Sequence, residues 1–282
     1  MNIRTFYPLL LVPLLFVLLL TASAAQAQVS IAPTMVFIHD NTNMNEIYVT
    51  NTSSTPQELN VSLRFGYPST NEEGSVSMRF DDEERQARYG VDQNVRVFPR
   101  RLVLQPGESQ TLRFQVMPMA DRPDGMYWAR AVIASRAVTP DVDDLELAEG
   151  EVGARVGVVF EQDIPLFYRK GNTTTGVIVH QVFSDIDEER LVLRPHVSRD
   201  GNSPFLGTVQ AEMFDSDGNM VQSTSRNAFF YFEEYRRLEI PVEELAPGRY
   251  RVDLHFDTQR RDISARDLVQ AERQTHTIEV DI

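Results

Sequence analysis

The chain has 282 residues, a formal net charge of −14 and no cysteine. This acidic balance argues against nucleic-acid binding, which needs a basic surface to meet the phosphates. The lack of cysteine excludes disulfides and thiol catalysis. A chain of this length normally forms two domains, each held by its own hydrophobic core.

The first 27 residues have the pattern of a secretory signal peptide. Arg4 supplies positive charge, residues 8–20 form an apolar run too short to span a bilayer comfortably, and Ala25-Gln-Ala27 supplies small residues for cleavage. We expect cleavage before Gln28, with an uncleaved membrane anchor as the alternative. No later stretch is apolar enough to cross a membrane, so we expect an exported protein without stable membrane insertion.

Residues 28–170 are predicted to form a first β-sandwich. Alternating apolar residues bounded by turn signals predict strands at 29–38, 46–51, 58–65, 95–98, 110–117, 126–136 and 155–169. The polar stretch 68–93 interrupts this rhythm. We expect an inserted loop or hairpin there, with at most a short helix.

The strand pattern restarts after a plausible linker at 170–176, which predicts a second sandwich over residues 171–282. Its strands are expected at 177–183, 191–198, 207–214, 228–232, 236–242, 248–256 and 275–280. Asp217-Gly218 is a hairpin signal, and Pro247-Gly-Arg-Tyr250 resembles the corner where immunoglobulin-like sandwiches place a tyrosine. The predicted fold is therefore all-β, with two immunoglobulin-like β-sandwich domains in series after the signal peptide.

The last strand of the first domain has the most informative pattern in the chain. Val156, Val158 and Phe160 alternate and so share one face, with Ile164 continuing it. An acidic segment at 141–151 precedes this strand and the linker follows it. Such a strand either completes its own core or offers its edge to a partner, and the alternation alone fits both readings.

The sequence shows no pattern of catalytic or metal-binding residues. The five histidines have no metal-ligand spacing, and no zinc-protease or serine-hydrolase motif is present. Asp215-Ser-Asp217-Gly218-Asn219 fits a hairpin turn better than a calcium loop. Trp128 is expected in a core rather than as a sugar-stacking platform. We therefore expect no cofactor, no metal and no enzymatic activity.

Four segments of the first domain resemble the periplasmic pilus-assembly chaperones, the PapD-like family. They are Ser30-Ile-Ala-Pro-Thr34, then Val49-Thr-Asn51 with Pro56, then the run from Phe98-Pro99 to Leu112-Arg113, and finally Leu166-Phe-Tyr-Arg169. The resemblance covers about 140 residues, whereas the second domain matches only as a generic immunoglobulin-like sandwich. It implies a periplasmic protein whose partners are exported subunits of a pilus or another surface assembly.

The resemblance also implies a mechanism, which is donation of a strand to a subunit with an incomplete sandwich. The partner-binding residues would be Val156, Val158, Phe160 and Ile164. Members of the family also hold a subunit's C-terminal carboxylate with an arginine in the first strand and a lysine in the last. The matching positions here are Met35 and Pro165, neither of which carries a charge.

Two functions of different classes remain open from the sequence. The first is a non-enzymatic assembly chaperone or accessory that binds subunits by β-strand donation. The second is a surface or periplasmic adhesion module built from immunoglobulin-like domains. Strand donation predicts an unpaired edge at residues 156–160 in the free protein, whereas adhesion predicts that this edge is covered.

Overall fold

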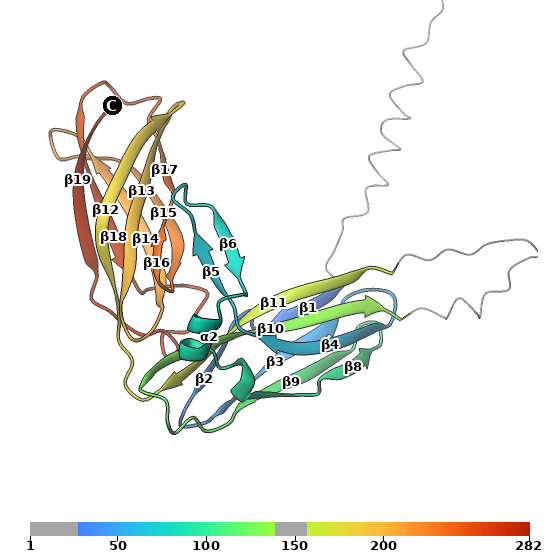
Figure 1. Cartoon of the computed structure of the whole chain (residues 1–282). Helices are drawn as coiled ribbons and strands as arrows, with labels where there is room; N and C mark the ends of the chain where they lie inside the picture. Colours follow the sequence, from blue (N-terminus) through green and yellow to red (C-terminus); the bar gives the residue numbers. More distant parts are fainter. Residues whose placement is uncertain (1–27, 139–156) are drawn as a thin grey trace, which may run out of the picture.

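The computed structural model describes residues 28–138 and 157–282. The predicted signal peptide, the acidic segment 141–151 and Val156 lie outside these residues. The described chain is built almost entirely of strands, which form two sandwiches meeting at an angle (Figure 1). The predicted all-β class and the two sandwiches are confirmed. No helix in the described ranges combines the length and hydropathy needed to span a membrane.

The first sandwich has the strand order of an immunoglobulin-like domain. A four-stranded sheet runs in the order β1 (Val29–Ala32), β3 (Met44–Asn51), β9 (Ser109–Val116), β7 (Val95–Phe98). It faces a five-stranded sheet in the order β2 (Val36–His39), β11 (Val159–Lys170), β10 (Gly125–Ala137), β4 (Gln57–Arg64), β8 (Arg101–Leu104). Inward alternate residues such as Ile47, Leu112 and Phe114 are fully buried between the two sheets, as alternation predicts.

The predicted strand at 29–38 is divided into two. It forms β1 in one sheet and β2 in the other, and the Ala32–Pro33 peptide between them is cis. The chain changes sheets in the same way between β7 and β8, at the cis Phe98–Pro99 peptide. Proline has no N–H to give to a ladder, so strand pairing is readily broken at such positions.

The second sandwich is also immunoglobulin-like in strand order. One sheet holds β12 (Thr175–Asp187), β13 (Arg190–Gly201), β16 (Glu233–Tyr235) and β17 (Leu238–Pro241). The other runs in the order β15 (Met220–Phe230), β14 (Phe205–Phe214), β18 (Arg249–Asp257), β19 (Gln274–Asp281). The predicted strand at 228–232 is only the end of the longer β15, and Tyr231 turns away from it.

A tyrosine corner is present in each sandwich. The Tyr250 hydroxyl donates to the Ala246 carbonyl at 2.7 Å, which confirms the corner predicted from the sequence. Tyr127 makes the equivalent bond to the Pro123 carbonyl at 2.7 Å. Each bond ties the start of a strand to the preceding loop. The loop before β10 also contacts the second sandwich, because the Asp124 carbonyl accepts a hydrogen bond from the Asn202 side chain at 3.1 Å.

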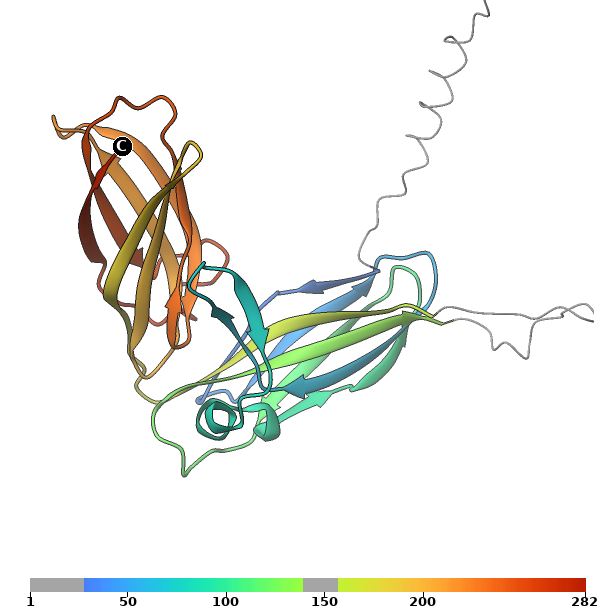
Figure 2. The same ribbon diagram turned by 45° about the horizontal axis from the view of Figure 1, so that its top comes forward.

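The polar stretch 68–93 forms a hairpin and a short helix, as predicted. The hairpin consists of β5 (Tyr67–Thr70) and β6 (Val76–Arg79), and helix α2 (Glu83–Tyr89) follows it. The Asp82 side chain caps α2 by accepting a hydrogen bond from the backbone N–H of Arg85 at 3.0 Å. A 3₁₀ turn, η1 (Asp92–Asn94), leads into β7. Figure 2 shows the hairpin and α2 in the angle between the two sandwiches.

An aromatic cluster joins the sandwiches at this angle. Trp128 is 1% exposed and its ring stacks on Tyr89 at 5.0 Å between centroids, while Tyr231 of the second sandwich meets it edge-on at 5.0 Å. Trp128 is thus buried as predicted, but it packs between the two sandwiches rather than inside the first. We call this group the junction cluster; it also includes Phe37, Phe65, Tyr67, Met126, Phe167, Leu206, Phe232, Ile263, Leu268 and Val269.

The predicted linker is tied to both sandwiches by hydrogen bonds. The backbone N–H of Gly171 donates to Asp40 at 2.7 Å, and that of Asn172 donates to Asp124 at 3.0 Å. On the other side, the N–H of Thr174 donates to the Asn202 side chain at 2.9 Å. The connection between β11 and β12 is therefore a fixed turn.

Glu234 is a buried carboxyl group at the junction of the two sandwiches. Burial raises the pKa of Glu234 to about 7, against the opposing effects of Arg236 and of the Tyr231 N–H that the carboxylate accepts. Its carboxyl group also lies 3.5 Å from the hydroxyl of Thr70 on the inserted hairpin. The folded protein therefore binds this proton more tightly than the unfolded chain does.

We expect Glu234→Gln to remove part of the pH dependence of stability. The ordinary glutamate pKa is 4.5, so the stabilisation due to the bound proton is complete below pH 4.5 and is lost as pH rises through 7. The difference between these pKa values corresponds to at most about 3 kcal/mol. In urea unfolding, the free energy of unfolding of the variant should therefore rise relative to that of the wild type between pH 5 and pH 8. Glu243→Gln, at an exposed glutamate outside the junction cluster, serves as the control, and an equal difference at every pH would refute the expectation.

Candidate functional site

The edge of β11 is paired along only part of its length. On one side β11 pairs with β10 throughout, from Val159 opposite Arg136 to Lys170 opposite Gly125. On the other side β2 pairs only with Leu166 to Arg169. Within the described chain no strand pairs with this second edge over residues 159–165. At about 3.3 Å per residue, these positions present about 23 Å of free strand edge.

The predicted donor residues divide into two groups along this strand. Val158 is 56% exposed and Phe160 is 44% exposed, although both are large and apolar. Ile164, on the same face, is 6% exposed and belongs to the core of the first sandwich. The side chain of Ile164 is therefore already buried in the protein's own core, whereas Val158 and Phe160 keep exposed apolar surface in the free protein.

Gln162 lies between the exposed Phe160 and the buried Ile164 on the same face of β11. It is half-buried, and its side-chain amide donates to the backbone carbonyl of Val29 on β1 at 2.9 Å. This bond ties β11 to the opposite sheet at the margin of the core. Val158 and Phe160 lie beyond that margin, and Val159 on the opposite face is also 56% exposed. Both faces of this end of the strand are thus open.

A positive charge lies beside Pro165, on the neighbouring strand. Arg130 of β10 is directly opposite Pro165 in the strand register. Its Nη2 donates to the Asp163 carbonyl at 3.0 Å, while its Nε is buried without a hydrogen-bond partner among the described residues. Burial lowers the pKa of Arg130, and nearby Tyr231 and Asp163 oppose this effect. Met35, the other matched position, is half-buried and packs against the junction cluster.

Arg64 on β4 adds a second guanidinium to this face. It pairs with Asp163 at 2.6 Å, so its charge is balanced within the protein. Arg130 has no carboxylate at ion-pair distance in the described chain, so no direct ion pair balances its charge there. Arg130 was not among the partner-binding residues predicted from the sequence. Its only signal was its place in the alternation of 126–136, on the same face as Trp128.

Two of the histidines come together in the second sandwich. The rings of His180 and His196 are 5.1 Å apart, and His196 lies 2.7 Å from Glu233. Among the residues that the structure describes, no group of three or more potential ligands has a geometry that would hold a metal ion.

No protein-family model and no curated protein matches this sequence. Solved structures similar to the chain include the YadV chaperone, with 11% identity, a TM-score of 0.43, and coverage of 91% of this chain and 100% of the other. The Pseudomonas aeruginosa CupB2 chaperone has 11% identity and a TM-score of 0.41, covering 90% and 100%. The E. coli chaperone DraB has 14% identity and a TM-score of 0.40, covering 90% and 98%. These are likenesses of fold.

Proposed function

We propose that this protein is a non-enzymatic assembly chaperone or accessory that binds exported subunits by donating the edge of β11. The observation that carries the proposal is the edge at residues 159–165, which no described strand pairs, beside the exposed side chains of Val158 and Phe160. A free edge next to exposed apolar side chains is the combination that β-strand addition uses. The four sequence segments that resemble the periplasmic pilus-assembly chaperones also support it.

In this proposal, the main chain and the side chains of β11 have separate roles. The backbone groups of residues 159–165 pair with a strand of the subunit. Val158 and Phe160, together with Val156, fill a groove in it. Ile164 holds the inner half of the strand on its own core, so that the edge is presented as part of a rigid sheet. Rigid presentation lowers the entropy lost on binding.

Arg130 completes the proposed site with a charge. A subunit strand paired with β11 would end near Pro165, where the ladder with β2 begins. Arg130 lies opposite Pro165 and is able to bind a carboxylate there, such as a chain terminus. In this way β10 would supply the charge that Met35 and Pro165 cannot.

The exposed edge favours strand donation over the adhesion reading, which expects this edge to be covered. We further propose that residues 28–170 form the partner-binding domain and residues 171–282 a second domain that supports it from across the junction. The proposed place of action is the periplasm, after removal of residues 1–27. The inserted hairpin would fix the angle between the domains, because Thr70 both donates to the Tyr235 carbonyl at 2.6 Å and accepts from the Tyr235 N–H at 2.9 Å.

Hydrogen exchange tests the proposal at the backbone. The tagged protein would be isolated from its native host with any bound exported subunit, and exchange would be compared with that of the free protein. We expect peptides covering residues 157–165 to gain protection in the complex. Peptides covering β12, an edge strand of the second sandwich, should not change. A complex that protects other surfaces and leaves 157–165 unchanged would contradict strand donation.

A further inference from the structure

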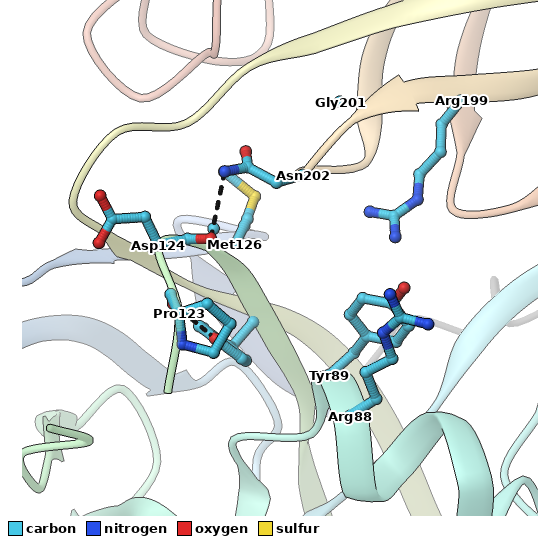
Figure 3. Close-up of a pocket in the computed structure, with 10 residues that line it drawn as sticks. Arg88, Tyr89, Pro123, Asp124, Met126, Arg199, Gly201 and Asn202 are labelled. Carbon is cyan, nitrogen blue, oxygen red and sulfur yellow. Dashed lines mark hydrogen bonds between the residues drawn. The ribbon is translucent and has the colours of Figure 1, made fainter. Parts of the chain in front are cut away.

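Two arginines from different sandwiches face one pocket at the junction (Figure 3). Arg88 lies in the last turn of α2, and Arg199 lies near the end of β13. The pocket has a volume of about 180 Å³. A single water needs only roughly 10–15 Å³. The space is therefore large enough for a chemical group of several atoms.

The ring of Tyr89 contacts both guanidinium groups. The Cζ of Arg88 is 5.2 Å from the centroid of the Tyr89 ring, and the Cζ of Arg199 is 4.8 Å from it. Neither arginine forms an ion pair with a carboxylate in residues 28–138 or 157–282. The pocket thus brings two uncompensated positive charges together in a protein whose net charge is −14.

Arg199 is also incompletely hydrogen-bonded. Its Nη1 is buried without a hydrogen-bond partner among the described residues. Burial lowers the pKa of Arg199 and the charges of Arg88 and Arg85 act in the same direction, while Tyr89 opposes them. A buried guanidinium with an unused donor is costly unless an acceptor meets it.

The acidic residue at the pocket does not supply that acceptor. Asp124 lines the pocket, but its Oδ2 accepts the backbone N–H of Asn172 at 3.0 Å. Figure 3 shows its carboxylate on the far side, pointing away from the guanidinium groups. Pro123 and Met126 line the pocket on the side opposite the arginines, and Arg88 is itself exposed to solvent.

We propose that this pocket binds a compact oxyanion, a phosphate or carboxylate group, between Arg88 and Arg199. Guanidinium groups present paired donors that match such anions, and the bound anion would bridge the two sandwiches. Because a ligand that binds only the folded protein stabilises it, the junction would become more stable when the anion is present. The proposal is independent of strand donation, since neither arginine lies on β10 or β11.

Calorimetric titration with inorganic phosphate and, separately, with acetate tests this proposal. Ionic strength is held constant with sodium chloride, and the full-length mature protein is used. We expect saturable binding of at least one anion, weakened roughly tenfold to a hundredfold by Arg88→Gln or by Arg199→Gln. Arg96→Gln, at an exposed arginine of β7, is the matched control and should bind as the wild type does.

The outcomes separate the two sources of the anion. Binding of phosphate alone identifies a tetrahedral oxyanion, and binding of acetate identifies a carboxylate that a protein or small acid can supply. Circular dichroism confirms that each variant is folded, and the exposed Arg88 is the position where folding is least at risk. Absence of saturable binding of both anions, or equal binding by the Arg88, Arg199 and Arg96 variants, would overturn the proposal.

Discussion

Replacement of Val158 and Phe160 together by serine is expected to abolish binding of an exported subunit without changing the melting temperature. Each apolar side chain buried in a partner contributes roughly 1.5–3 kcal/mol, so the double change should weaken binding about 10²- to 10⁴-fold. Both side chains are largely exposed in the free protein, at 56% and 44%, so the fold loses little. A pull-down beside a thermal melt measures both effects.

Ile164→Ser is the matched control, because Ile164 lies on the same face of β11 as Phe160. Its side chain is 6% exposed in the core of the first sandwich, so a hydroxyl there would be buried among apolar groups. We expect a large fall in melting temperature from this change alone. A comparable fall for the Val158 and Phe160 double variant would mean that the whole strand serves its own core, and the strand-donation proposal would then fail.

Trp128→Ala is expected to uncouple the two sandwiches. The indole stacks on Tyr89 and meets Tyr231, so its loss removes contacts on both sides of the junction. Truncation of a buried tryptophan costs about 3–5 kcal/mol. Scanning calorimetry should show one cooperative transition in the wild type and two in the variant, because each sandwich keeps its own core.

Trp128→Phe provides the control for this prediction. The Trp128 Nε1 is buried without a hydrogen-bond partner in the described part of the chain, so phenylalanine keeps the ring packing and loses no hydrogen bond. It should retain a single transition at a similar temperature. Two transitions already present in the wild type would show that the junction cluster does not couple the domains.

The sequence allowed much of the fold to be predicted because the signal is local. Alternating residues identified β7, β9 and β10 within about a residue of their observed ends. β8 was missed because it follows β7 almost directly and has only one buried residue. The first part of β15 was missed because it is mostly polar and exposed, so its alternation carries little hydrophobic signal.

The site was less predictable because it depends on register between distant segments. Val158 and Phe160 were recognised by their alternation. The sequence could not distinguish them from Ile164, because only the structure shows that the core includes Ile164 and ends before Phe160. Arg130 and Pro165 lie opposite each other on the neighbouring strands β10 and β11. No local sequence pattern contains this relation. Arg88 and Arg199 are still further apart in sequence and meet only because the sandwiches pack at the inserted helix.

In the proposed strand donation, the short ladder between β2 and β11 would fix where a partner strand stops. β2 occupies the edge from Leu166 onward, and Pro165 has no N–H to extend a foreign ladder toward it. On the side of β2, a partner strand would therefore stop at about residue 165. Any further length that a subunit's groove requires would have to come from the residues before Val159, so the start of β2 would fix the register of the partner strand.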